Sequence, residues 1–290
     1  MQKGAFSCAP PGLRANYHNM NKVLGRLPAT ITRPATPKFA RPLVLCPELF
    51  TTISHLSLLV GYLVSLGWEV CALDLHAAPR GVPPGLAGLV ELAGEAITAL
   101  DREVVALGHG VGGLVALHLT ARPDVAAGVA LAPALPGFRS PLCLSLRNRL
   151  AARLGGALRP PAGRTLFELV ADADQFQRET IIRALRPAPG GVGREVARGA
   201  LTAPPASGKP RLIVCGDSDI FAPLDRVRGL AAATGAELAT LPGRGHWLIG
   251  GRSLERAVNT TQRFLVKALG RELLLLYPED PPDPEPDAQA

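Results

Sequence analysis

The segment at residues 103–115 constrains the fold more than any other part of the chain. It reads EVVALGHGVGGLV, so an apolar run leads into four closely spaced glycines, and apolar residues at helical spacing follow. This pattern is typical of a strand that turns sharply into a helix. Glycines at 108, 110, 112 and 113 permit positive φ angles and close approach of backbones. We therefore expect a buried strand, a tight corner with Gly110 at its tip, and a helix packed back on the strand.

Strand-like and helix-like segments alternate along much of the chain. Apolar runs typical of buried strands lie at 42–46, 68–73, 125–131, 211–215 and 237–241, and helical patterns lie at 53–66, 87–100, 224–234 and 254–269. Such alternation predicts an α/β fold, with a mainly parallel sheet flanked by helices on both faces. Sites in these folds form at the carboxyl ends of the strands. The residues that follow expected strands are Cys46, Asp74, Gly110, Asp219 and His246.

Three segments depart from this rhythm. Residues 1–40 are rich in Pro, Arg and Asn with weak periodicity, and we expect a loosely ordered N-terminal arm with a short edge strand at 29–32. Residues 138–205 carry Arg-rich amphipathic helices, which predicts a helical cap inserted between two core segments, 41–137 and 206–270. Residues 271–290 form an acidic, Pro-rich tail that we expect to be disordered.

Composition limits which binding partners and which cellular location we expect. The net charge of +7 is not organised as a basic stripe interleaved with aromatic residues, so we expect no nucleic-acid binding. The five cysteines form no metal-type pair, and several lie in apolar runs, which favours a reducing, cytoplasmic location. No apolar stretch is long enough to span a membrane, and the N-terminus lacks the shape of a signal peptide. The glycines lack the spacing of a phosphate loop and the sequence shows no cluster of metal ligands, so we expect no cofactor and no metal. The oligomeric state is not assigned.

Four motifs in chain order resemble those of the α/β-hydrolase family over residues 41–270. The stretch GHGVGG at 108–113 resembles the common G-H-S-x-G-G corner, with Gly110 where the family has its serine nucleophile. GDSDIFAP at 216–223 resembles the stretch that carries the catalytic acid, here Asp219, and GRGH at 243–246 resembles the turn that carries the catalytic histidine, here His246. Asp74 begins the segment at the place of the D-x-x-G-x-G loop of the family. The resemblance implies the α/β-hydrolase fold with a helical cap.

The resemblance also implies where an oxyanion site would lie. The family often has His-Gly after its first parallel core strand, whereas this chain has Cys46 and then a proline that has no N–H to donate. A backbone N–H of Glu48 or Leu49 would replace it, and the N–H of Val111 would be the second donor. Without a serine at 110 no acyl-enzyme can form there, and this holds whether the glycine is natural or engineered.

Two hypotheses for the function follow. In the first, Asp219 orients His246, which acts as a general base on a water above Gly110 or directly on a small apolar ester, thioester or lactone, as a hydrolase or lyase. In the second, the dyad is a relic, and the protein is a non-catalytic pseudo-hydrolase that binds a ligand or acts as a scaffold. Glycine at 110 fits this second hypothesis too, because it relieves the strain of the corner.

Five other residues have weaker claims on the site. Cys46 is a conceivable replacement nucleophile, although a buried and inert thiol is the expected state. For His109 we expect a packing role. His76 follows a strand end and is a candidate to line the site, but we expect an exposed position in a loop. Asp217 is the alternative acid if the turn is read two residues earlier, and Ser218 is expected to bond its own turn.

Overall fold

The structure is a computed structural model that describes residues 17–77, 85–154 and 156–274. Its centre is an eight-stranded sheet in the order β1-β2-β4-β3-β5-β6-β7-β8. From β4 along the sheet to β8 neighbouring strands run parallel, whereas β2 pairs antiparallel with both β1 and β4. The strands are β1 (Tyr17–Leu24), β2 (Leu27–Pro34), β3 (Leu43–Cys46), β4 (Val70–Leu73), β5 (Val104–His109), β6 (Val125–Leu131), β7 (Arg211–Gly216) and β8 (Glu237–Leu241). Every residue of β3 to β7 is buried, as expected for parallel strands covered on both faces.

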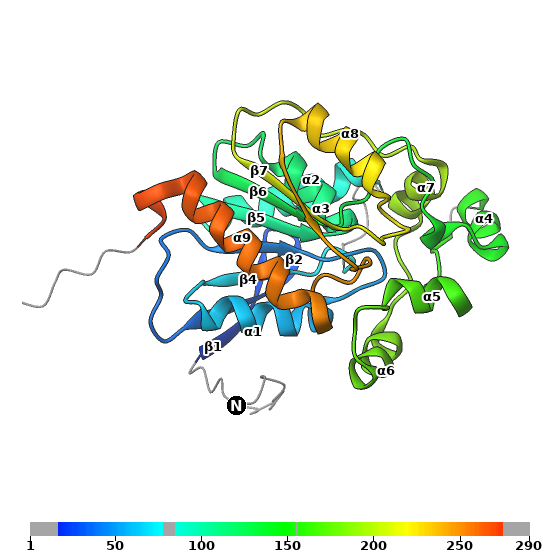
Figure 1. Cartoon of the computed structure of the whole chain (residues 1–290), viewed down its shortest axis with the longest axis horizontal. Helices are drawn as coiled ribbons and strands as arrows, with labels where there is room; N and C mark the ends of the chain where they lie inside the picture. The colour runs from blue at the N-terminus through cyan, green and yellow to red at the C-terminus, as the bar shows by residue number, and fades with distance from the viewer. Residues whose placement is uncertain (1–16, 78–84, 155, 275–290) are drawn as a thin grey trace, which may run out of the picture.

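Helices cover both faces of this sheet. One face carries α1 (Ser57–Ser65), preceded by the 3₁₀ turn η1 (Ile53–Leu56), and α9 (Leu254–Leu269), preceded by η3 (Gly251–Ser253) (Figure 1). The other face carries α2 (Leu86–Thr98) and α3 (Val111–Leu119), and α8 (Leu224–Thr234) packs beside β7. The long helix α9 has the bounds expected from its sequence. None of the described helices has the length and apolar character needed to cross a bilayer.

The N-terminal region differs from the expected arm. Residues 17–34 form a hairpin, β1 and β2, and β2 pairs with β4, so the expected edge strand at 29–32 lies inside the sheet and β1 is the edge. The physical reason is burial: Leu27, Ala29 and Ile31 alternate with more exposed residues and place their side chains in the core. The first sixteen residues of the expected arm lie outside the described residues.

The C-terminal boundary differs as well. Residues expected to begin the tail form the turn η4 (Gly270–Leu273), whose Leu273 is buried and accepts a hydrogen bond from the backbone N–H of Ala40 at 2.8 Å. Leu274 bridges Phe39. The acidic residues from 275 onward lie outside the described residues.

The segment at 138–205 contains the turn η2 (Pro141–Cys143) and four helices, α4 (Leu146–Arg153), α5 (Gly163–Leu169), α6 (Gln175–Ala184) and α7 (Gly190–Arg198). In Figure 1 these helices lie together beyond one end of the sheet. Several hydrogen bonds join this segment to the core; among them, the N–H of Arg186 donates to the carbonyl of Phe50 at 2.9 Å, and the N–H of Leu86 donates to Glu195 at 2.7 Å. The segment therefore sits against loops that follow the strands.

Candidate active site

The corner between β5 and α3 has the tight geometry that its glycines predict. Gly110 has φ 55° and ψ −118°, a conformation that residues with a side chain rarely adopt. A Cβ at Gly108 would lie 2.0 Å from the carbonyl oxygen of Gly112, and one at Gly112 would lie 2.1 Å from that of Cys46. Strand, corner and helix can approach this closely only because these positions lack side chains.

His246 and Asp219 come together at this corner. His246 follows β8 and its Nδ1–H donates to Oδ2 of Asp219 at 2.8 Å. Asp219 follows β7, and its other oxygen accepts the backbone N–H groups of Phe221 at 2.7 Å and Ala222 at 3.0 Å. Backbone groups of the loop after β7 thus hold Asp219 in place, and Asp219 orients the ring of His246.

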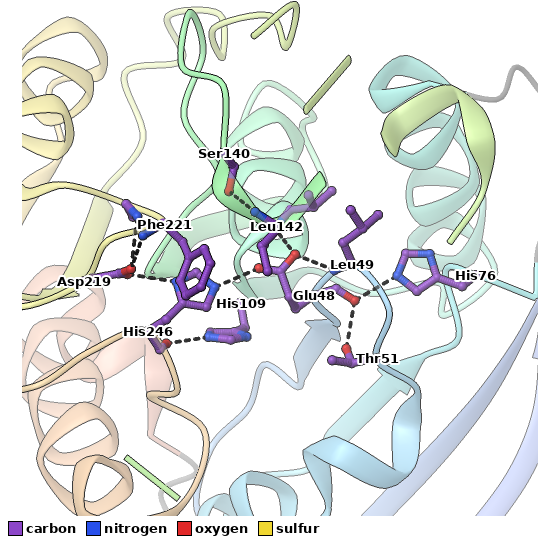
Figure 2. A network of polar contacts seen from close by, with 12 residues as sticks. Glu48, Leu49, Thr51, His76, His109, Ser140, Leu142, Asp219, Phe221 and His246 are labelled. Atoms are coloured by element: carbon purple, nitrogen blue, oxygen red, sulfur yellow. Dashed lines mark hydrogen bonds and ion pairs between the residues drawn. The ribbon is translucent and has the colours of Figure 1, made fainter. Parts of the chain in front are cut away.

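The space above Gly110 is filled by the side chain of Glu48. A Cβ built at Gly110 would lie 1.2 Å from Oε2 of Glu48, so the carboxylate stands where a side chain at 110 would begin. Oε2 accepts a hydrogen bond from Nε2 of His246 at 3.0 Å. Figure 2 shows the imidazole between two carboxylates, Asp219 on one side and Glu48 on the other. The expectation of an empty space for water therefore does not hold in this conformation.

The other oxygen of Glu48 occupies the expected oxyanion site. Oε1 accepts the backbone N–H of Val111 at 3.1 Å and that of Leu49. These are two of the donors that the sequence predicted, but they bind an oxygen of the protein itself. Only the backbone of Glu48 entered the sequence-based prediction; the signal that could have identified its side chain is an acidic residue directly after a buried strand, in an otherwise apolar segment.

The main chain of Glu48 is held as firmly as its side chain. Its carbonyl accepts the N–H of Thr51 at 3.1 Å, the hydroxyl of Thr51 at 2.8 Å and Nε2–H of His76 at 2.9 Å. Phe50, two residues later, has φ 68°, a strained conformation for a residue with a side chain. Strain of this kind persists only where surrounding contacts impose it.

Burial and mutual charge set the protonation of the cluster. Burial alone would raise the pKa of Glu48, but its hydrogen bond to His246 and the charge of that ring outweigh burial and lower it. Burial likewise opposes ionisation of Asp219, whose pKa is lowered by the same ring. For His246 burial acts to lower the pKa, and the two carboxylates more than reverse this, raising it to about 10. The resting cluster at neutral pH is therefore an imidazolium between two carboxylates.

The structure also places the residues with weaker claims. His109 is buried, donates from Nε2 to the carbonyl of His246 at 2.8 Å and packs edge-on against Trp247, which fits the packing role expected for it. Burial, followed by the charge of His246, lowers the pKa of His109 to about 4, so the ring is neutral. Burial raises the pKa of Cys46 to about 12, with a smaller contribution from Cys71, and a thiol in that state is a poor nucleophile.

Two expectations need correction. His76 is half-buried rather than exposed, because it donates to the carbonyl of Glu48. Asp217 does not approach His246; its Oδ1 accepts the N–H of Gly243 at 2.8 Å and the hydroxyl of Ser218 at 3.0 Å, so it serves the turn.

Sequence reasoning missed Asp172, a buried residue between α5 and α6. Its Oδ2 accepts the N–H of Gly245 at 2.6 Å, and its carbonyl accepts the N–H of Arg252 at 3.2 Å. Asp172 thereby fixes the segment on both sides of His246. No local pattern signals this role, because the contact joins residues 73 positions apart.

Among the described residues, Glu48, His109 and His246 each offer one ligand atom, and these atoms lie within 4.8 Å of one another. Ligands of a tetrahedral zinc at about 2.1 Å stand about 3.4 Å apart, whereas Oε2 of Glu48 and Nε2 of His246 are only 3.0 Å apart, at hydrogen-bond distance. The contact between Glu48 and His246 already joins two of the three. The observed distances fit a proton-bridged network better than a metal centre.

Comparison with known proteins identifies the family of the chain. The sequence profile described as "Alpha/beta hydrolase family" matches residues 43–258, from β3 into α9. The chain belongs to the alpha/beta hydrolase family. No curated protein sequence matches the chain significantly.

Many solved structures share the fold. A monoacylglycerol lipase from Paleococcus ferrophilus is 20% identical, with 79% of this chain and 96% of the lipase covered and a TM-score of 0.62. The 2-hydroxy-6-oxo-6-phenylhexa-2,4-dienoate hydrolase of Rhodococcus sp. strain RHA1 is also 20% identical, with coverages of 88% and 99% and a TM-score of 0.63. The thioesterase domain of the curacin biosynthetic pathway is 17% identical, with coverages of 86% and 99% and a TM-score of 0.58. At these identities the likeness establishes the α/β-hydrolase fold and no particular substrate.

Proposed function

We propose that this protein is a hydrolase of the α/β-hydrolase fold that works without a serine nucleophile on a small or medium-sized apolar ester, thioester or lactone. The observation that carries the proposal is the placement of His246: Asp219 fixes one ring nitrogen, and the other points to the corner above Gly110. In this position the ring can exchange a proton with a reacting group, as in acyl-transfer sites built on a histidine and an aspartate.

The solved structures support the choice of substrates to test. Their names include a monoacylglycerol lipase, an esterase from Thermogutta terrifontis and a thioesterase domain. Members of a fold differ widely in chemistry, so these names set the panel and do not select within it.

The test is a screen of esters, thioesters and lactones with the wild type and with His246→Ala and Asp219→Asn. Loss of the base or of its orienting partner lowers turnover on the order of 10³-fold or more in triad enzymes, and we expect a loss of this size in both variants. His18→Ala is the matched control, because His18 is exposed on the edge strand β1 and should leave the rate unchanged. Equal turnover in wild type and His246→Ala would exclude the dyad as the catalytic element.

One observation favours a second candidate, a non-catalytic protein that binds a ligand or partner. The ring nitrogen of His246 and the N–H groups of Val111 and Leu49 are all satisfied by Glu48, and Glu48 itself is 1% exposed. Such a closed site is expected in a protein that no longer admits substrate. Absence of turnover across the screen, together with a rise in melting temperature with an apolar ester or acid, would favour this candidate.

A further inference from the structure

We propose that Glu48 is the nucleophile of this site and that the substrate is an acyl thioester. The inference rests on the proposed function and deepens it, by naming the attacking group and choosing among the three substrate classes. It starts from the two oxygens of one side chain. Oε2 lies above Gly110 and accepts a hydrogen bond from His246, and Oε1 accepts hydrogen bonds from two backbone N–H groups.

Glu48 is oriented by more contacts than a carboxylate needs in order to fill space or to form a structural ion pair. Glu48 is held through Oε1, through Oε2 and through its carbonyl, which accepts three hydrogen bonds. The loop that carries it contains the positive φ of Phe50. Preorganised groups and local strain are typical of a side chain set for reaction. Glycine at 110 is then a requirement, because any Cβ there would overlap Oε2.

The proton on Nε2 of His246 permits a reaction in two steps. In the first step Oε2 attacks the thioester carbonyl carbon, the carbon–sulfur bond breaks, and His246 gives its Nε2 proton to the departing sulfur. The products are a free thiol and a mixed anhydride between the acyl group and Glu48. Because the anhydride carries no charge, His246 loses one of the two carboxylates that raise its pKa and becomes a neutral base held by Asp219.

In the second step His246 takes a proton from water, and the hydroxide attacks Cδ of Glu48. The negative charge develops on Oε1, which already lies on the N–H groups of Val111 and Leu49. Collapse breaks the bond between Cδ and Oε2 and releases the acid with Oε2. The proton left on the new carboxyl group of Glu48 passes to the departing carboxylate, which restores the resting state with one water consumed.

The leaving group selects the substrate class. A carboxylate is a weak nucleophile, and forming an anhydride by expelling an alkoxide from an alkyl ester is strongly uphill. A thiol has a pKa of about 8.5, so a thiolate leaves far more readily, and the imidazolium beside it supplies the proton. Among the ester, lactone and thioester classes, the thioester is therefore the one that a carboxylate nucleophile can cleave.

The test follows the atoms of Glu48 in the wild-type protein. Thioesters of N-acetylcysteamine with short, medium and long saturated acyl chains are turned over in water enriched in oxygen-18, and the peptide that contains residue 48 is examined by mass spectrometry. We expect oxygen-18 in Glu48 and, when hydroxylamine is added during turnover, a hydroxamate at the same residue. Neither label should form at Glu179, an exposed carboxylate on α6.

Variants give an independent measurement. Glu48→Gln keeps the shape but removes the nucleophilic charge, so we expect thioester turnover to fall on the order of 10³-fold or more, as for other lost nucleophiles. Glu179→Gln is the control and should retain the wild-type rate. The labelling experiment needs no variant, so a folding defect in Glu48→Gln would not affect it.

Each other outcome overturns the inference. Thioester turnover with no label in Glu48 excludes it as nucleophile, while the proposed hydrolase function stands. Turnover of esters or lactones but not thioesters excludes the substrate class, again with the hydrolase function intact. Failure to turn over any of the three classes, with no hydroxamate at Glu48, removes both the inference and the proposed function.

Discussion

Replacing Gly110 by serine tests whether Glu48 occupies the corner. A Cβ at this position would lie 1.2 Å from Oε2 and 2.0 Å from Cδ of Glu48, so the side chain must leave its place. That movement breaks its contacts to His246, Val111 and Leu49. Gly110→Ser alone should therefore destabilise the protein without creating a serine hydrolase.

The size of the effect follows from those contacts. Hydrogen bonds to a charged group contribute about 1.5–3 kcal/mol each, so displacing the carboxylate should cost about 3–5 kcal/mol after it finds new partners. The backbone conformation of Gly110, φ 55° with ψ −118°, adds about 1–3 kcal/mol for a residue with a Cβ, because it lies outside the regions that such residues commonly adopt. Gly270→Ser isolates this second contribution, because Gly270 has φ 56° and ψ −143°, close to the angles of Gly110, and a Cβ added to it would meet no atom within 4 Å.

A double-mutant cycle separates the overlap from other effects. In Glu48→Ala the corner is vacated, so adding Gly110→Ser to it should cost no more than the control substitution. We expect the loss in free energy of unfolding of the double variant to be smaller than the sum of the two single losses by at least about 2 kcal/mol. The free energies of unfolding are measured by urea denaturation of the four proteins, with equal slopes as the check on comparability.

The double variant also has a chemical readout. The serine hydroxyl at position 110 would face His246, and the N–H donors of Val111 and Leu49 would be free of Glu48. We expect hydrolysis of activated aryl esters to appear in Glu48→Ala with Gly110→Ser, and to be absent from either single variant. Additive stabilities, within about 0.5 kcal/mol, would show that the two positions do not share space and would refute the reasoning.

Three further predictions follow from single contacts. Burial lowers the pKa of His246 but its two carboxylates raise it to about 10, above the ordinary histidine value of 6.5. The contribution of His246 to the free energy of unfolding is therefore complete below pH 6.5 and is lost as the pH rises toward 10. Urea denaturation at a series of pH values should show a smaller loss of stability over this range in Glu48→Gln than in the wild type. Asp172→Asn weakens the bond to the N–H that precedes His246, and we expect a loss of about 1–2 kcal/mol in denaturation together with lower turnover. Thr120→Val removes the hydroxyl that accepts two N–H groups of the buried Arg211, at 2.8 and 2.6 Å, and should cost about 2–3 kcal/mol, whereas Thr120→Ser should restore most of it.

Local patterns were sufficient for much of the architecture. The glycines around position 110 predicted the corner, because only residues without a side chain permit its φ and its contacts. Strand and helix periodicity predicted the parallel part of the sheet and the bounds of α9. Apart from the strand at 29–32, the N-terminal hairpin was missed, because the buried apolar residues of β2 alternate with more exposed ones and form no continuous run.

The geometry of the candidate site was likewise predicted only in part. Asp219 and His246 were predicted because each lies in a short motif after a strand, and the sheet brings the ends of such strands together. Glu48 was assigned only a backbone role, and Asp172 no role at all. Their side chains act across 198 and 73 positions, on His246 and on the N–H of Gly245.

The sequence by itself determined the fold family, the bare corner at Gly110 and the histidine–aspartate pair, since these depend on local conformation and on the order of strands. Only the tertiary structure decided what fills the corner. A side chain is directed by the loop that carries it and by the donors that converge on it, and those donors come from β5–α3, from the loop after β8 and from the loop of Glu48 itself. Convergence of this kind exists only once the chain has folded, which is why an acidic residue after a buried strand does not by itself reveal where its carboxylate lies.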